Sequence, residues 1–197
     1  ALDVYGRVAR QIQSFARQYG TPGPNGATVI PIRLTQSDIA SLVGAPTGSL
    51  YHRFATRDLL VAQAWLRAVA AFQVGYLSAL VNPDVDAAAA GAAQHVPLWA
   101  AAHPERAALL LRYRREELVA SWPAELREAL GGMNERVDRA LRDHARRRFG
   151  SAAKRHMVVV RYALVHLPEA AVRSTSEPGL LVAAVGAAAR AALRSTS

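Results

Sequence analysis

From Thr56 to Ser197 the chain carries apolar residues at the spacing of a helical face, and many of these residues are alanine. Alanine favours helices and is poorly suited to strands. Hydrophobic residues make up 51% of the sequence but aromatic residues only 7%, so a core must be built largely from small side chains. We therefore predict an all-α fold of closely packed helices rather than a β-sandwich.

Helix boundaries follow from proline, glycine and capping residues, which start or end helices. The run NPD at 82–84 ends the first long helix, Gly150 ends a later one, and Pro97 and Pro168 are expected to break helices. The helices predicted from Thr56 onwards are 56–80, 85–95, a short helix after Pro97, 104–119, 121–148, 154–166 and 180–193.

The N-terminal part has a different pattern. Residues 3–19 place Val8, Ile12 and Phe15 on one face, which predicts an amphipathic helix that ends at Gly20. After a turn-rich run, ATVIPIRL at 27–34 alternates β-branched residues, but Pro31 limits it to an edge strand. Since the chain offers no obvious partner strand, residues 20–33 are expected to be irregular.

Residues 34–57, LTQSDIASLVGAPTGSLYHRFATR, form the pattern of two short helices joined by a tight turn. Thr35 can cap the first helix and Gly44 can end it. The second helix, roughly 47–53, carries hydrogen-bond donors around Leu50 and Phe54 as buried anchors. A polar, basic helix after a glycine turn is typical of a recognition helix in a DNA groove, although an ordinary helical hairpin shares the spacing.

The charge distribution favours an anionic partner, with DNA ahead of a membrane surface. The formal net charge is +9 and the pI is about 10.9. Residues 1–57 hold six arginines against two aspartates, a net of +4, and residues 136–155 hold eight basic against two acidic side chains, a net of +6. Because nearly all the basic residues are arginine, the codon usage of a GC-rich genome would explain them equally well, and the charge only supports the DNA interpretation.

The run GAPTGSLYHRFATRDLL at 44–60 resembles the recognition signature of the tetracycline-repressor (TetR) family. Weaker similarity continues in WAAAHPERAALLLRYRREELV at 99–119. The resemblance implies a homodimeric, sequence-specific transcription regulator, a repressor released from DNA by a small-molecule ligand. It also implies a helix-turn-helix domain at 1–57 and a helical ligand-binding and dimerisation domain at 58–197, whose last two substantial helices form the dimer interface.

Residues 4–44 instead resemble the start of a catabolite-activator (Crp/FNR) DNA-binding domain, in which a helix and a wing strand precede an LTQxDIAxLVGA helix. The RETV-like recognition helix of that family is absent, and PTGSLYHRF stands in its place. The two resemblances meet at Gly44 and Ala45, which is the pattern of a hybrid produced by fusion or by convergent drift within one family. Either origin yields a supporting helix, a positioning helix and a recognition helix.

By resemblance, side chains within 45–55 read bases, and polar groups around them hold the phosphates of a palindromic operator in double-stranded DNA. The candidate DNA-binding residues are Thr35, Gln36, Thr47, Gly48, Ser49, Tyr51, His52, Arg53 and Arg57.

The helical part contains large aromatic side chains that would line a pocket for a small apolar or amphipathic ligand, with one histidine and one arginine as polar groups. These candidate pocket residues are Trp65, Phe72, Tyr76, His95, Trp99, Tyr113 and Arg114. The alternative is that the aromatic residues simply form the core.

Other kinds of chemistry lack support in the sequence. With no cysteine, neither disulfides nor thiolate metal sites can form, and the six histidines make no HxxxH or HExxH pair. Phosphate-binding glycine loops and the GxSxG elbow are absent, so we predict no enzymatic activity, no cofactor and no metal site.

No apolar run reaches the length of a membrane span, and no signal-peptide pattern opens the chain, which predicts a cytoplasmic protein without a membrane partner. Two rival functions remain open: a small-molecule-binding or enzymatic helical protein, and a nonspecific nucleoid-type DNA binder.

Overall fold

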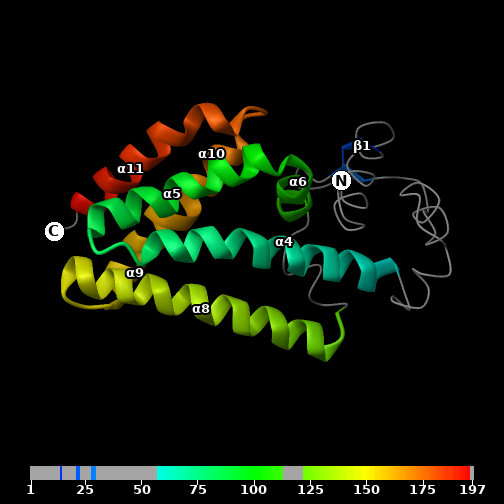
Figure 1. Ribbon diagram of the computed structural model, residues 1–197, viewed down its shortest axis with the longest axis horizontal. Coiled ribbons are helices and arrows are strands. Elements are labelled where there is room, and N and C mark those ends of the chain that lie inside the picture. Colours follow the sequence, from blue (N-terminus) through cyan, green and yellow to red (C-terminus); the bar gives the residue numbers. More distant parts are fainter. Residues whose placement is uncertain (1–13, 15–20, 23–27, 30–56, 113–121, 196–197) are drawn as a thin grey trace. The chain divides into compact units, whose positions relative to one another are not determined.

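The computed structural model describes residues 14, 21–22, 28–29, 57–112 and 122–195, and these are almost entirely helical (Figure 1). The predicted all-α class is confirmed for this part of the chain. The helices are α4 (Arg57–Leu80), α5 (Val85–Ala102), α6 (Pro104–Arg112), α8 (Ala124–Phe149), α9 (Lys154–Arg161), α10 (Leu167–Arg173) and α11 (Val182–Arg194), with a π-helical turn η2 (Tyr162–His166) and a 3₁₀ turn η3 (Pro178–Leu181).

The chain divides into two compact units, each described here by itself. Unit 1 contains residues Ala1–Val69 and Pro104–Glu128, and unit 2 contains Ala70–His103 and Ala129–Ser197. Helices α4 and α8 are each divided between the two units, after Val69 and after Glu128. The predicted boundary at residue 57 borders a stretch outside the described residues, so the division into 1–57 and 58–197 stays a prediction.

Two short strands in unit 1 bear on the N-terminal prediction. Strand β1 (Thr21–Pro22) pairs antiparallel with β2 (Thr28–Val29), so that Thr21 faces Val29 and Pro22 faces Thr28. The expectation that the run at 27–34 lacks a partner in this chain is therefore wrong for Thr28 and Val29. Their partners are Thr21 and Pro22, which are close by in the sequence and do not form a distant wing strand.

Helix α5 continues through Pro97, so the predicted break between 85–95 and a shorter helix is wrong. An interior proline costs a helix about 3 kcal/mol, because it removes one hydrogen bond and crowds the preceding turn. Pro97 is buried, and so are Ala92, Ala93 and Ala100 on the same helix. Burial of this face compensates for the proline, which local sequence rules cannot anticipate.

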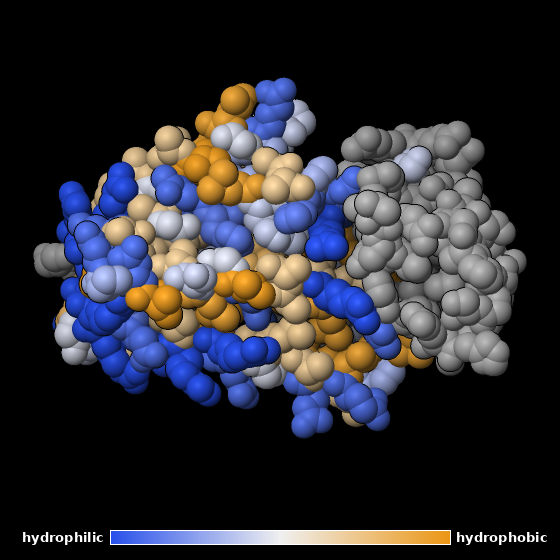
Figure 2. Space-filling model, viewed as in Figure 1, coloured by the Kyte–Doolittle hydropathy of each residue, from blue (hydrophilic) through white to orange (hydrophobic). Residues whose placement is uncertain are grey.

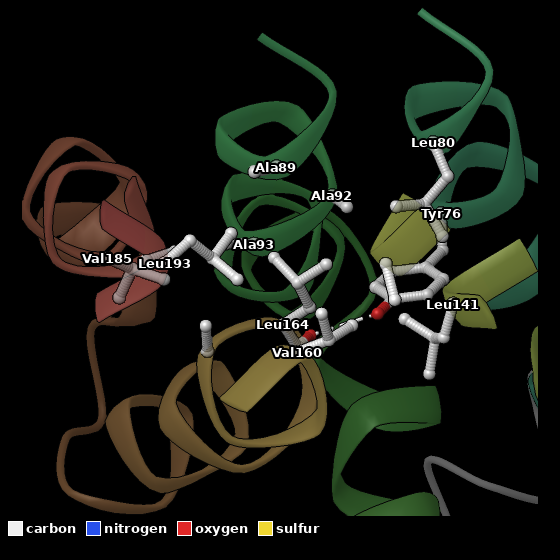
Figure 3. Close-up of a cluster of buried hydrophobic side chains, with 13 residues drawn as sticks. Tyr76, Leu80, Ala89, Ala92, Ala93, Leu141, Val160, Leu164, Val185 and Leu193 are labelled. Carbon is white, nitrogen blue, oxygen red and sulfur yellow. Dashed lines mark hydrogen bonds between the residues drawn. The ribbon is translucent and has the colours of Figure 1, made fainter. Parts of the chain in front are cut away.

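The predicted break at Pro168 is also wrong, because a π-helical turn carries the helix past it. Leu167 donates its backbone N–H to the carbonyl of Tyr162, five residues earlier. Pro168 has no N–H to offer Leu164, four residues before it. The hydroxyl of Tyr76 on α4 donates to that Leu164 carbonyl at 3.0 Å (Figure 3). A side chain from another helix thus satisfies the acceptor that the proline leaves without its helical donor.

The π turn also explains the burial pattern of the segment from α9 to α10. Every fourth residue is buried, namely His156, Val160, Leu164, Pro168 and Val172. A regular α-helix has about 3.6 residues per turn, so a strict spacing of four drifts steadily around its surface. One wider turn reduces that drift and keeps the five side chains against the core.

The core of unit 2 is built from small side chains, as the alanine content predicts. Helices α5 and α11 lie side by side (Figure 1). They approach closely at Gly186, where an added Cβ would lie 2.6 Å from Nε2 of Gln94. The buried cluster drawn in Figure 3 is formed by Tyr76, Leu80, Ala89, Ala92, Ala93, Leu141, Ala145, Val160, Ala163, Leu164, Val185, Ala189 and Leu193.

Candidate functional site

The predicted DNA-reading segment is not part of the structure described here. Thr35, Gln36, Thr47, Gly48, Ser49, Tyr51, His52 and Arg53 lie outside the described residues. Arg57 is the first residue of α4, but its side chain is not described. These nine residues therefore stay a prediction.

Four of the seven predicted pocket residues come together in unit 2, between α4 and α5. Phe72 stacks on Tyr76 with ring centroids 5.5 Å apart, and it meets Trp99 edge-on at 5.5 Å. His95 lies 5.1 Å from Phe72. His103 extends this group through Trp99 at 5.2 Å, so we define the aromatic cluster as Phe72, Tyr76, His95, Trp99 and His103. Sequence reasoning missed His103 as a site residue, although it follows Trp99 by four residues, at the C-cap of α5, which is close enough for the two rings to meet.

The other three predicted pocket residues do not join this cluster in the described structure. Trp65 belongs to unit 1, where its ring meets Trp122 edge-on at 5.6 Å. Its indole Nε1 is buried and has no hydrogen-bond partner among the described residues. Tyr113 and Arg114 lie outside the described residues. Trp65 therefore belongs to a different unit from Phe72, Tyr76, His95 and Trp99, with which the sequence groups it as a pocket residue.

His95 is held in a defined orientation against α4. Its Nε2 donates to the backbone carbonyl of Phe72 at 2.8 Å, which fixes the tautomer of the neutral ring. A Cβ added at Gly75 would lie 2.3 Å from Cε1 of His95, so only glycine admits the ring here. Burial lowers the pKa of His95, with a smaller effect from His103, and the ring is neutral at pH 7. His95 thus joins α5 to α4, in addition to any contact with a ligand.

Tyr76 is likewise committed to a contact between helices. Its hydroxyl donates to Leu164, and burial raises the pKa of the phenol well above its ordinary value. Since Tyr76 and His95 already bond to backbone carbonyls, what remains of the cluster is chiefly aromatic, and Tyr76 and Trp99 are buried. This composition suits an apolar or planar ligand better than a strongly charged one.

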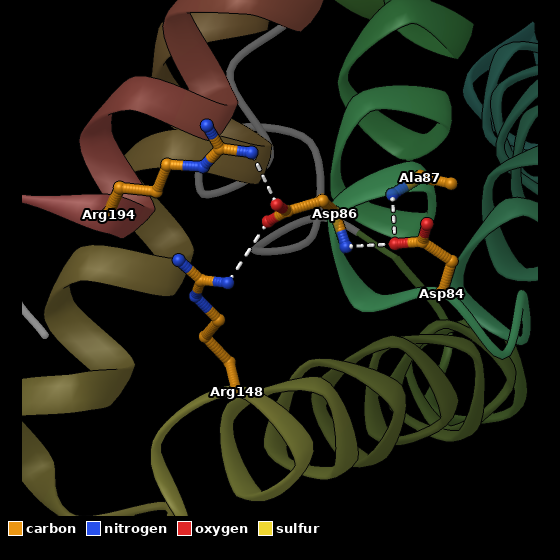
Figure 4. A network of polar contacts seen from close by, with 5 residues as sticks. All are labelled: Asp84, Asp86, Ala87, Arg148 and Arg194. Atoms are coloured by element: carbon orange, nitrogen blue, oxygen red, sulfur yellow. Dashed lines mark hydrogen bonds and ion pairs between the residues drawn. The ribbon is translucent and has the colours of Figure 1, made fainter.

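Several arginines of the predicted basic stretch hold unit 2 together. Arg147 donates to the carbonyls of Leu80 and Asn82, both at 2.7 Å, and so satisfies backbone groups at the C-terminal end of α4. Arg148 pairs with Asp86 at 3.0 Å and Arg194 pairs with the same carboxylate at 2.5 Å (Figure 4). We call these contacts of Arg147 and Arg148 the α8 clamp.

Asp86 lies in the first turn of α5, which Asp84 caps by accepting from two backbone N–H groups (Figure 4). The hydrogen bond from Arg194 lowers the pKa of Asp86, and the charges of Arg148, Arg194 and Arg190 act in the same direction. The carboxylate is therefore charged at neutral pH and links α5, α8 and α11.

Other charges of this stretch are paired on the surface. Arg142 and Arg161 both contact Asp138, and Arg146 contacts Asp143 at 2.7 Å. Hydrophilic residues gather along α8 in the space-filling view (Figure 2). Asp138 and Asp143 are already subtracted in the net of +6, so only the pairing of Arg148 with Asp86, which lies outside the stretch, lowers the charge available to an external anion further.

Neither metal ligation in the described residues nor similarity to known proteins assigns a function to this chain. Within the described ranges, no group of three or more His, Cys, Asp or Glu side chains could hold a metal ion. None of the helices described here combines the length and the apolar character needed to cross a membrane. No protein-family model matches the chain, and a comparison with curated proteins finds no similar sequence. The likeness to TetR and Crp/FNR proteins therefore rests on the motifs alone.

Proposed function

We propose that this protein is a dimeric, ligand-controlled DNA-binding transcription regulator of the TetR type. The observation that carries the proposal is the run GAPTGSLYHRFATRDLL at 44–60, which has the composition of a recognition helix after a glycine turn. The helical fold of the described residues agrees with that architecture. In this scheme a ligand at the aromatic cluster changes the spacing of two recognition helices and thereby weakens their fit to DNA.

The DNA-binding part is tested by selecting genomic fragments that the purified protein retains, followed by gel shifts at several salt concentrations. Tyr51→Ala should weaken binding to a selected palindrome by about 1–3 kcal/mol per half-site, because an interface contact is lost. The melting temperature should stay unchanged. Equal affinity for random DNA would favour the nucleoid-type alternative, and no DNA binding at all would refute the proposal.

Exposed apolar side chains on α9 and η2 support the dimer. Val158 is 61% exposed and Tyr162 is 55% exposed, and they lie four residues apart. We propose that this face packs against its own copy across a twofold axis. Deletion of the C-terminal helix α11 would not test the dimer interface by itself, because Val185 and Leu193 on this helix belong to the core.

A surface charge tests the interface without removing core residues. Val158→Glu should raise the fraction of monomer in sedimentation velocity, because it places two like charges in a closed apolar contact. Val74→Glu is the matched control, since Val74 is also an exposed helical valine, 73% accessible. If both variants remain dimeric, the interface lies elsewhere.

A second candidate function, small-molecule binding without DNA, is favoured by the aromatic cluster itself. A panel of apolar and amphipathic compounds can be screened by thermal shift on the full chain. Trp99→Phe should lower the affinity for a ligand that binds at the cluster, whereas Trp65→Phe, in unit 1, should leave that affinity unchanged. Ligand binding combined with an absence of DNA binding would select this alternative.

A further inference from the structure

His144 is a fully buried histidine without a hydrogen-bond partner. It lies on α8, its side chain is 0% exposed, and neither ring nitrogen has a partner in the described part of the chain. Leaving a buried polar group unpaired is costly, and buried groups of this kind are uncommon in folded proteins. The ring therefore calls for an explanation beyond packing.

The charged groups around His144 are mostly positive. Arg147 and Arg148 act on it from its own helix, and Asp86 acts on it from α5. Asp86 in turn is paired with Arg148 and Arg194, so its negative charge is already shared. Burial and the two arginines lower the pKa of His144 to about 4, and the ring is neutral in the folded protein at pH 7.

The two arginines that oppose a proton on His144 are the ones that form the α8 clamp. Arg147 holds the C-terminal end of α4, and Arg148 holds the first turn of α5. A positive imidazolium beside them would be both buried and repelled. Separation of this end of α8 would relieve both effects, because it exposes the ring to water, which hydrates the proton and screens the charge of the arginines on the same segment.

We propose that His144 is an acid-sensitive latch: when the ring takes up a proton, residues 141–149 of α8 detach from the end of α4 and the start of α5. The latch does not depend on DNA or on a ligand, and it holds whether or not the proposed function is correct. Asp86 is not the trigger, because its pKa is lowered from 3.8 and it remains charged while His144 titrates.

The direction of the pH effect follows from proton linkage. In the open state the ring regains an ordinary pKa near 6.5, whereas in the closed state it is about 4. Opening therefore takes up a proton between these two values and becomes more favourable as pH falls through that window. The ratio of open to closed molecules should rise about 25-fold between about pH 7.5 and about pH 5.0.

Hydrogen exchange on the full chain tests the latch at these two pH values, after correction for intrinsic exchange rates. Amides in 141–150 and 81–87 should lose protection by about 25-fold at the lower pH in the wild type, while α11 stays protected. His144→Leu should abolish the pH effect. His166→Gln is the matched control, since His166 is a helical histidine that is not buried, and it should keep the effect.

Two results would overturn the proposal: an undiminished effect in His144→Leu, or loss of protection across all of unit 2 together. His95→Phe is a further comparison, because the pKa of His95 is also lowered. Abolition of the effect by this variant alone would assign the trigger to His95. If His144→Leu does not fold, the Cε1 proton resonance of His144 decides: a midpoint well below about 6.5 supports the latch, and one at or above that value refutes it.

Discussion

Tyr76→Phe should destabilise unit 2 although it removes only one oxygen atom. The Tyr76 hydroxyl donates to the Leu164 carbonyl at 3.0 Å, and both residues are buried. The usual helical donor to that carbonyl is missing, because the residue four positions later is Pro168. The substitution leaves the ring volume nearly unchanged, so the loss is that of a hydrogen bond and not of packing.

The expected cost is the penalty of a buried acceptor without a partner, about 1–3 kcal/mol. For a chain of this size, about 2 kcal/mol corresponds to a fall in melting temperature of about 4–8 °C. Urea denaturation followed by circular dichroism measures the free energy directly. Val74→Thr is the control, because it is also close to isosteric and Val74 is exposed outside the proposed dimer face, so the stability should change by no more than about 0.5 kcal/mol.

A double-mutant cycle with Pro168→Ala isolates the cause. Alanine restores an N–H that can reach the Leu164 carbonyl, so Tyr76→Phe should cost less in that background, by about 1 kcal/mol or more. Any cavity left by the proline ring cancels in the cycle. The reasoning fails if Tyr76→Phe is neutral, or if its cost is the same in the wild-type background as in the Pro168→Ala background.

Three further substitutions test other contacts. Gly75→Ala should destabilise by about 1–3 kcal/mol in thermal melts because its Cβ overlaps the His95 ring, whereas Gly131→Ala, with no atom within 4 Å of its Cβ, should be neutral or stabilising. Arg147→Ala should cost about 0.5–1.5 kcal/mol in urea denaturation, since it removes two hydrogen bonds to backbone carbonyls at the end of α4 and water can replace only the donor to the exposed Asn82. Asp86→Asn should reduce the pH dependence of the folding stability. Because the pKa of this carboxyl is lowered from 3.8, its ion pairs stabilise the wild type above pH 3.8, and this stabilisation is lost as pH falls below that value. The stability difference between wild type and variant should therefore shrink in that acidic range.

Helix content and most helix ends were predictable because they depend on nearby residues. Alanine-rich apolar periodicity predicted α4 and α8 close to their observed bounds, and Gly150, with φ of 72°, ends α8 where expected. These features depend on nearby residues or on composition, and the residues alone specify them. The candidate pocket was predicted only in part: Phe72, Tyr76, His95 and Trp99 lie together, but Trp65, which the sequence grouped with them, lies in unit 1.

Only the tertiary structure decided what the prolines do and which polar groups are committed. Pro97 and Pro168 lie inside continuous helical segments, because buried packing and the hydroxyl of Tyr76 compensate for what proline removes. Arg147 and His144 lie in a stretch whose composition is typical of a basic, solvent-facing helix. Arg147 nevertheless donates to a carbonyl at the end of α4, and His144 is fully buried. Both outcomes depend on groups that lie far away in the chain, and no local pattern encodes the distance between such groups.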